Sequence, residues 1–219
     1  MLSVAVETST RSPSVAAREG ERSVAETLAG DRPHASDLLP ALDRLLHQLG
    51  ARPDAIEAVI AGTGPGSYTG LRVGIASALG LARGCAARVR AVPSGEALAW
   101  AELEPGQRAT MLLDARAGEL YLARYERTPD DIRVLIPPCI VRPEELVLEQ
   151  DDVIFGEAGI ERAAGLDAST AKRVRTDVHP LASATLELGL SRLERFGESP
   201  AKELEPLYLR AFAAKARKR

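Results

Sequence analysis

Short apolar runs, rich in β-branched residues and bounded by turn residues, occupy the first thirty residues. They are Leu2 to Glu7, Ser14 to Arg18 and Ser23 to Leu28. A Ser/Thr/Pro turn separates the first two, and Glu19-Gly20-Glu21 separates the second from the third. The pattern predicts a meander of three strands.

The apolar spacing then changes to that of a helix. Ser36 is a candidate N-cap, Asp37 stands in the first turn and Gly50 lies just past the end. Leucines recur at three- and four-residue spacing, at Leu38, Leu42, Leu45 and Leu49, with Leu39 and Leu46 beside them. This stripe is wide for one helix that covers one sheet.

A second helix with an unusual composition is predicted from about Thr69 to Ala82, after a buried strand over residues 56–61. Glycine, alanine and serine alternate in it with Leu, Val and Ile, so it is apolar or small nearly all round. Each glycine weakens a helix by about 1 kcal/mol relative to alanine. We therefore expect another segment to pack very close to this backbone. A strand over 87–92 and a short helix over 95–101 follow.

The same succession begins again after residue 104. Strands are predicted over 110–114, 119–125 and 132–136, a later strand over 152–156 and a long amphipathic helix over 181–196. Strands in a meander followed by helix and strand therefore occur twice, which predicts an α/β fold of two related lobes, each with a mixed sheet. We place the lobes at residues 1–103 and 104–219.

Composition narrows the classes of function. The 219 residues are 45% hydrophobic and 27% charged with a net charge of −3, typical of a globular protein and poor for gripping nucleic acid over a broad surface. Cys85 and Cys139 form no redox or zinc motif. The first residues lack a basic signal-peptide region, and no apolar run is long enough to span a bilayer. We expect a soluble cytoplasmic protein without membrane contact.

Four motifs resemble the TsaB (YeaZ) family. The most specific is Gly64-Pro65-Gly66-Ser67-Tyr68-Thr69-Gly70-Leu71-Arg72. The others are Val6 to Thr10 after the first strand, His34 to Pro40 at the start of the first helix, and Pro206 to Arg210 near the end. They span nearly the whole chain, so chance similarity is a poor explanation.

The resemblance implies two lobes of the actin, sugar-kinase and Hsp70-like ATPase (ASKHA) type. It also implies a non-catalytic scaffold and activator that pairs with a larger metal-bearing homologue, TsaD. TsaD transfers a threonylcarbamoyl group to adenosine 37 of tRNAs that read codons starting with A. A TsaE-type ATPase docks on the pair, tRNA is contacted mainly through the complex, and the isolated subunit is expected to form a homodimer.

The residues argue against a metal site and favour the absence of any cofactor. The catalytic homologue uses a His-x-x-x-His pair on the first helix, and here His34 is followed four residues later by Leu38. His47 is thirteen residues from His34, well round the helix. A single imidazole does not hold a transition metal tightly.

The glycine-rich run invites interpretation as a phosphate loop, but it lacks both Gly-Lys-Ser/Thr and Gly-x-Gly-x-x-Gly. We favour a strand-to-helix turn with positive φ, followed by a closely packed helix. A nucleotide between the lobes stays open as an alternative, and so does an ATPase or phosphotransferase function.

Catalytic side chains are hard to assemble from this sequence. A nucleophilic Ser9 or Ser67 needs a base, and nothing places His34, His47 or His179 beside either serine. A metallopeptidase function is disfavoured by the missing histidine pair. Glu7 and Asp114 end the first strands of the two lobes, where they either form a catalytic acid pair or, as we favour, bond to a turn. We predict no enzyme activity, with a weak intrinsic ATPase left open.

The apolar faces of the first two helices are the stronger functional lead, because apolar surface beyond what one sheet covers marks an interaction site. The predicted interface comprises Leu38, Leu42, Leu45, Leu49, Ile75, Ala78 and Leu79. Its occupant is the TsaD-type homologue or a second copy of the chain. The alternative is that both stripes are core. The basic end, residues 215–219, is either a tRNA contact or a solvated terminus.

Overall fold

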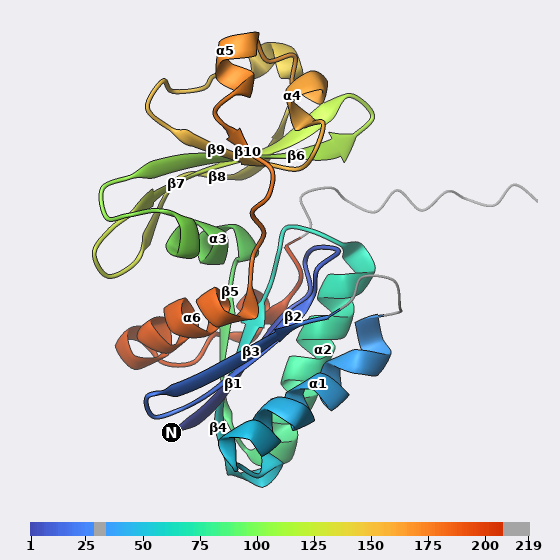
Figure 1. Cartoon of the computed structure of the whole chain (residues 1–219), viewed down its shortest axis with the longest axis vertical. Helices are drawn as coiled ribbons and strands as arrows, with labels where there is room; N and C mark the ends of the chain where they lie inside the picture. Colours follow the sequence, from blue (N-terminus) through green and yellow to red (C-terminus); the bar gives the residue numbers. More distant parts are fainter. Residues whose placement is uncertain (29–33, 208–219) are drawn as a thin grey trace, which may run out of the picture.

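The computed structural model describes residues 1–28 and 34–207, except for the side chains of residues 34–36 and 116. The chain forms two lobes stacked along the long axis of the molecule, each built on a five-stranded mixed sheet (Figure 1). Helix α3 (Ser94–Glu102) lies between the two sheets.

The first sheet has the strand order β3-β2-β1-β4-β5. The meander strands pair antiparallel, and β4 and β5 extend the sheet in parallel from β1. The strands are β1 (Leu2–Glu7), β2 (Ser14–Glu19), β3 (Arg22–Thr27), β4 (Ile56–Gly62) and β5 (Arg88–Val92). Strand β1 is buried along its whole length because helices cover both faces of the sheet.

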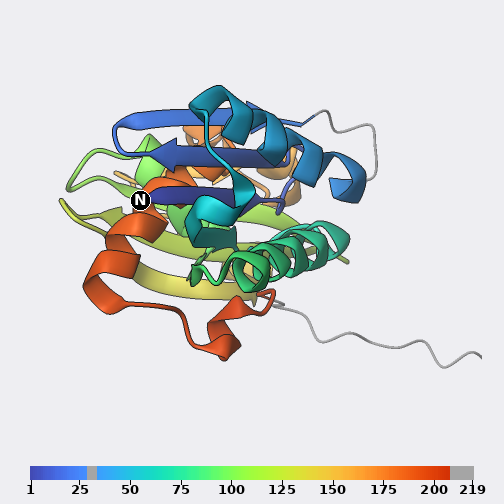
Figure 2. The same cartoon turned by 90° about the horizontal axis from the view of Figure 1, so that it is seen from below.

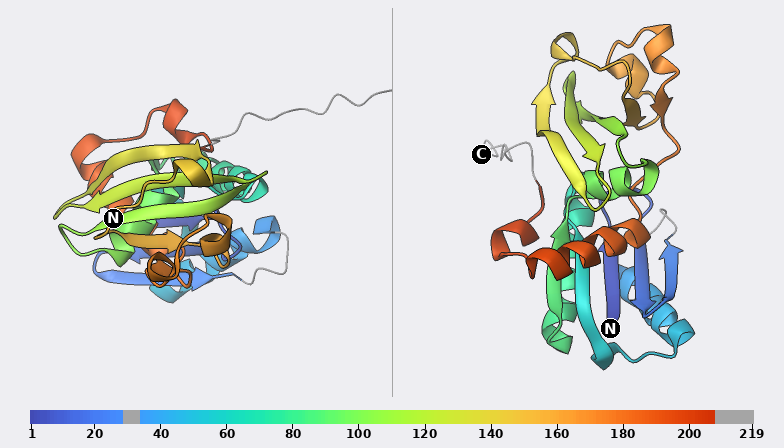
Figure 3. Two further views of the ribbon diagram at one scale, coloured as in Figure 1. Left: turned by 90° about the horizontal axis from the view of Figure 1, so that it is seen from above. Right: turned by 90° about the vertical axis from the view of Figure 1, so that its left-hand side faces the viewer.

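Three helices cover the first sheet. Helices α1 (His34–Leu49) and α2 (Tyr68–Cys85) lie side by side on one face (Figure 2), and α6 (Ala182–Phe196) crosses the other (Figure 3). The leucines of α1 pack with β1, β2 and β4 into one hydrophobic cluster. On the other face α6 comes very close to β4, since a Cβ on Gly189 would lie 2.2 Å from Ile60 Cγ2.

The second sheet has the strand order β10-β9-β6-β7-β8. Its strands are β6 (Arg108–Arg116), β7 (Glu119–Arg127), β8 (Ile132–Val141), β9 (Val153–Gly156) and β10 (Val174–Arg175). The short helices α4 (Ile160–Ala163) and α5 (Ala168–Ala171) lie on its far side. Single turns of 3-10 helix occur at Pro53–Ala55, Pro143–Glu145 and Ala201–Leu204.

The two sheets have the same topology. Read from β8, the second sheet runs antiparallel, antiparallel, parallel, parallel, as the first sheet does when read from β3. The predicted α/β fold of two related lobes is therefore confirmed. Each lobe has a meander of three strands to which two parallel strands are added.

The lobe boundary predicted at residue 104 needs one correction. It falls between α3 and β6, but α6 does not belong with the second sheet, because it packs against β1, β2, β4 and β5. The chain thus returns to the first lobe after β10. The apolar face of the amphipathic helix α6 covers apolar strand residues that would otherwise face solvent.

The predicted helix and strand ranges match closely, with differences at the ends. Helix α1 begins at His34, so Ser36 lies inside the first turn rather than at the N-cap. Helices α4 and α5 and strand β10 were not predicted, since none exceeds four residues. No helix within the described ranges is both long and apolar enough to cross a membrane.

Candidate functional site

The glycine-rich run is packed against the end of β1. A Cβ on Gly66 would lie 2.2 Å from Ser9 O, and one on Gly70 would lie 2.2 Å from Thr8 O. A Cβ on Gly74 would meet Thr8 Oγ1 at 2.1 Å. Only glycine allows α2 to approach Thr8 and Ser9 this closely, so the predicted close packing is confirmed.

Hydrogen bonds fix this contact. Ser67 N–H donates to Ser9 O at 2.6 Å, and Thr8 Oγ1 donates to Gly70 O at 2.8 Å. Ser67 is the N-cap of α2, and its Oγ accepts from Gly70 N–H at 3.2 Å. These N–H groups at the start of α2 are therefore used within the chain, which argues against the run as a phosphate cradle.

The turn that enters the run has the predicted positive φ. Gly64 has φ of 94° and precedes a cis bond to Pro65. Its N–H donates to Ser94 Oγ at 3.0 Å, and its carbonyl accepts from Ser94 N–H at 2.8 Å. The turn is thereby tied to the first residue of α3, which leads to the second lobe.

Glu7 is a buried carboxyl group at the centre of this region. Its Oε1 accepts from Ser9 N–H at 2.8 Å, and Thr185 Oγ1 of α6 lies 3.5 Å from Oε2. Burial raises the pKa of Glu7 above its usual value, although hydrogen bonds from Ser9, Ser94 and Thr8 act in the opposite direction. The favoured interpretation of Glu7, a strand-end residue that binds a turn, agrees with this geometry.

Asp114 has a different environment. It is exposed in β6, and its N–H donates to Glu157 Oε1 at 2.8 Å. Glu7 is enclosed by the first lobe, whereas Asp114 lies on the second. The two carboxylates do not share one environment, so the arrangement gives no support to a pair of catalytic acids.

Among the described side chains, neither Ser9 nor Ser67 forms a hydrogen bond with a histidine. Ser9 Oγ is buried without a hydrogen-bond partner among the described residues. His47 is exposed and its Nδ1 contacts Asp43 O at 2.9 Å. The side chain of His34 lies outside the described residues. Within the described part of the chain, no three His, Cys, Asp or Glu side chains gather in a way that could hold a metal ion.

Six of the seven residues predicted for the partner interface are buried within this chain: Leu38, Leu42, Leu45, Leu49, Ile75 and Ala78. The wide stripe on α1 is needed to fill the core against the sheet and α2. The prediction is corrected for these side chains, because in this conformation they have no surface to offer a partner. Leu79 is 39% exposed and stays a candidate.

The outer face of α1 and α2 nevertheless has unusual surface chemistry. Leu39 is 48% exposed on α1, and Leu79 is exposed on α2. Ala76, Gly80 and Gly84 are exposed at four-residue spacing, and a Cβ on either glycine would meet no atom within 4 Å. We call these five residues the α1–α2 face. The sequence indicated the small residues of this helix, but the only one of them assigned to the predicted interface was Ala78, which is buried.

Tyr68 and Arg72 of the motif are exposed, and the Arg72 guanidinium lies 5.3 Å from the centre of the Tyr68 ring. Of the motif near the end, Pro206 and Leu207 are described, and Leu207 N–H donates to Thr63 O at 2.9 Å. The rest of that motif and the basic residues 215–219 lie outside the described residues.

Comparisons with known proteins agree on one group of relatives. Residues 27–188 match the family model described as TsaD, tRNA N6-adenosine threonylcarbamoyltransferase. The tRNA threonylcarbamoyladenosine biosynthesis protein TsaB of Haemophilus influenzae is 32% identical over 94% of this chain and 92% of its own length. TsaB of Escherichia coli is 32% identical over 70% of this chain and 68% of its own length.

A solved structure extends the similarity to three dimensions. The crystal structure of a Pseudomonas aeruginosa protein, described as similar to the peptidase YeaZ, superposes with a TM-score of 0.79. The two proteins are 27% identical, and the match covers 95% of this chain and 99% of the other.

Proposed function

The chain belongs to the TsaB (YeaZ) family, and from this premise we propose that it is a non-catalytic subunit of the machinery that makes threonylcarbamoyladenosine in tRNA. Its role in tRNA threonylcarbamoylation follows from the family. The finer proposal is that it activates a TsaD-type transferase by binding it, and that a TsaE-type ATPase joins the pair. Modification of adenosine 37 in tRNAs that read ANN codons would then depend on this chain.

The observation that carries the proposal is the composition of the α1–α2 face. Exposed Leu39 and Leu79 supply apolar area, and Ala76, Gly80 and Gly84 allow a partner helix to approach the α2 backbone. The sheet beneath is already covered by the buried faces of the same helices. The fold of the single chain therefore does not need the exposed apolar side chains of this outer face for its own core.

The match to the TsaD family model suggests how such a pair would assemble. Two chains with the same lobe topology can pack through equivalent faces, as identical subunits do about a twofold axis. The α1–α2 face would then bind the corresponding helices of the transferase, or those of a second copy when the transferase is absent. Contact with tRNA would be made mainly through the complex.

Reconstitution of the reaction tests the proposal. Threonylcarbamoyladenosine on tRNA would be measured by nucleoside mass spectrometry in a mixture of the adenylate-forming enzyme, the TsaD-type and TsaE-type proteins, threonine, bicarbonate and ATP. We expect product to depend on this chain. Equal product without it, with all proteins from one organism, would contradict the proposal.

Calorimetric titration with ATP tests the rival phosphotransferase function. The glycine-rich run is occupied by the end of β1, so we expect little binding to the isolated chain. Micromolar affinity with turnover would favour the phosphotransferase instead.

A further inference from the structure

The chain between the end of α6 and Leu207 runs along one edge of the first sheet. Strand β5 stands last in the strand order of that sheet, so one side of it faces no neighbouring strand. Residues 197–207 lie beside this strand (Figure 3). We call residues 197–207 the strap. It contains the 3-10 turn Ala201–Leu204.

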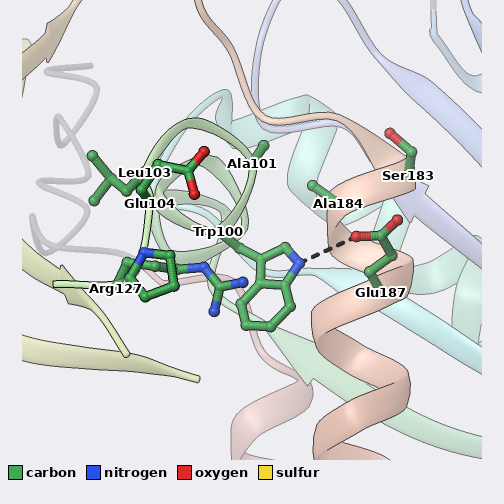
Figure 4. Close-up of a pocket in the computed structure, with 9 residues that line it drawn as sticks. Trp100, Ala101, Leu103, Glu104, Arg127, Ser183, Ala184 and Glu187 are labelled. Carbon is green, nitrogen blue, oxygen red and sulfur yellow. Dashed lines mark hydrogen bonds between the residues drawn. The ribbon is translucent and has the colours of Figure 1, made fainter. Parts of the chain in front are cut away.

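Helix α6 brings the strap to β5 from a fixed position. Near its start, Glu187 accepts a hydrogen bond from Trp100 Nε1 at 3.2 Å, and the Arg127 guanidinium stacks 3.2 Å from the centre of the Trp100 ring (Figure 4). At its other end Gly197 has φ of 75° and turns the chain out of the helix. The side chain of Arg90 in β5 then donates to Gly197 O at 3.0 Å. The start of the strap is therefore tied to β5.

Ser199 binds two main-chain groups in the middle of the β5 edge. Its N–H donates to Val89 O at 3.0 Å, and its Oγ accepts from Ala91 N–H at 3.0 Å. In a parallel sheet, one residue of a neighbouring strand makes this pair of bonds with its own N–H and C=O groups. Here the hydroxyl group takes the place of the carbonyl group. Ser199 therefore imitates one residue of a sixth strand beside the five of the sheet.

The strap does not continue this imitation past one residue. Pro200 follows directly and has no N–H to donate. The Ser199 hydroxyl group donates to Glu203 Oε2 at 2.9 Å, so it is an acceptor toward β5 and a donor toward the strap. The strap returns to the sheet at Leu207, whose N–H donates to Thr63 O at 2.9 Å just after β4. It therefore covers the edge without adding a strand that could itself be extended.

The strand under the strap is suited to pairing with another strand. It reads Arg88-Val89-Arg90-Ala91-Val92, which contains β-branched residues and neither glycine nor proline. An uncovered strand edge presents N–H and C=O groups that pair with strands of other molecules. The two arginines oppose pairing of β5 with a second β5 by charge repulsion, but they do not oppose pairing with other strands.

We propose that the strap is an autoinhibitory contact that closes the β5 edge against strand addition by a second copy of the chain. The opposite edge of the same sheet is β3. Pairing of β5 with β3 of another copy joins two sheets head to tail. Contacts of this kind do not close, and they grow into open chains of subunits. The strap prevents this growth and limits the sheet to five strands.

Amide hydrogen exchange in the full chain tests the contact at Ser199. Ser199→Ala removes the acceptor of the Ala91 N–H and should raise the exchange rate of that amide about tenfold. Ser199→Pro also removes the donor to Val89 O and should raise the rate further. Ser199→Thr keeps both groups and should exchange as the wild type does. Ser183→Ala is the matched control, because Ser183 is also half-buried but lies near the start of α6 (Figure 4).

Sedimentation velocity tests the autoinhibition. Ser199→Pro should form assemblies larger than a dimer that grow with protein concentration, whereas the wild type, Ser199→Thr and Ser183→Ala should not. Circular dichroism checks that the variant keeps its fold. Adding Ala25→Lys to Ser199→Pro should suppress the growth, because Ala25 is exposed on β3 and the lysine faces the arginines of β5.

Three results would overturn the proposal. The first is an Ala91 amide that exchanges at the same rate in Ser199→Ala as in the wild type. The second is a folded Ser199→Pro variant with the size distribution of the wild type. The third is growth that persists when Ala25→Lys is added, which would exclude β3 as the strand that pairs with β5. None of these measurements involves tRNA, so failure here is distinct from failure of the proposed function.

Discussion

Gly62 lies directly against the carboxyl group of Glu7, so that a Cβ on Gly62 would stand 2.2 Å from Glu7 Oε2. Gly62 ends β4 and Glu7 ends the neighbouring parallel strand β1. The buried carboxyl group therefore occupies space that only a glycine leaves free. This contact fixes the position from which the chain enters the glycine-rich turn.

Gly62→Ala should destabilise the protein by about 1–3 kcal/mol, because the added methyl group overpacks a buried site next to a polar group. Urea unfolding followed by circular dichroism measures the change. Gly80→Ala is the matched control, since a Cβ there meets no atom within 4 Å. In the exposed helix it should stabilise by up to about 1 kcal/mol. Equal effects of the two substitutions would contradict the proposed packing.

Glu7 should make the stability depend on pH. Burial raises the pKa of Glu7 in the folded protein above its usual value of 4.5, so the folded state holds this proton more tightly than the unfolded state. Stability should therefore fall as pH rises from about 4.5 through the folded pKa and then level off.

Glu7→Gln removes the titration of this carboxyl group. The difference in stability between the wild type and the variant therefore separates the effect of Glu7 from that of other buried carboxyl groups. The stability of the wild type relative to the variant should decrease across the same pH range. Urea midpoints between pH 4.5 and 8 provide the measurement. A constant difference over that range would show that burial of Glu7 does not control its protonation.

Arg192 of α6 joins the two lobes. It is 9% exposed, and its Nε donates to Asp131 Oδ1 at 2.9 Å in the turn between β7 and β8. It also forms an ion pair with Glu96 of α3. Arg192→Ala should cost about 3–5 kcal/mol, since it leaves two carboxylates without their buried partner.

Arg195→Ala is the control for this cluster. Arg195 also pairs with Asp131, at 3.2 Å, but its side chain is 42% exposed. Its loss should cost no more than about 1 kcal/mol. If both variants unfold at the same urea concentration, the buried cluster does not hold the lobes together.

The sequence predicted the strands and long helices well because each has a clear hydrophobic period. The duplicated topology followed from the order of these elements, although α6 was placed in the wrong lobe. Its amphipathic pattern indicates that one face is buried but does not identify the sheet that it covers. That information lies in contacts such as Gly189 against Ile60, which join distant parts of the sequence.

The candidate site was predicted less completely. Close packing against the predicted helix was foreseen from the cost of its glycines, which is borne out at Gly70 and Gly74, but the contact of Gly66 before the helix and the partners Thr8 and Ser9 were not foreseen. For the predicted interface, the stripe of leucines indicates that this face of α1 is buried. It does not indicate whether the face is buried in the core of the chain or against a partner protein. Ala78 is buried, whereas Leu79, one position further along, is exposed. Which of the two residues is buried depends on how α2 is rotated about its axis on the sheet, and the sequence pattern does not specify that rotation.

Leu79→Asp tests the α1–α2 face directly. The substitution places a charge beside Gly80 at the centre of the proposed contact, where it would be desolvated on binding. We expect the folded variant to lose co-elution with the TsaD-type protein on size-exclusion chromatography and to support at least about tenfold less threonylcarbamoyladenosine formation. Circular dichroism should show a thermal midpoint near that of the wild type, because Leu79 is already 39% exposed.

Val147→Asp is the matched control for this substitution. Val147 is 76% exposed in the second lobe, away from α1 and α2, so the same chemical change there should leave both complex formation and product unchanged. If Leu79→Asp co-elutes and supports modification as well as Val147→Asp does, the partner does not bind at the α1–α2 face. If both variants fail, the partner contacts a wider surface than the two helices, and the second lobe must be part of it.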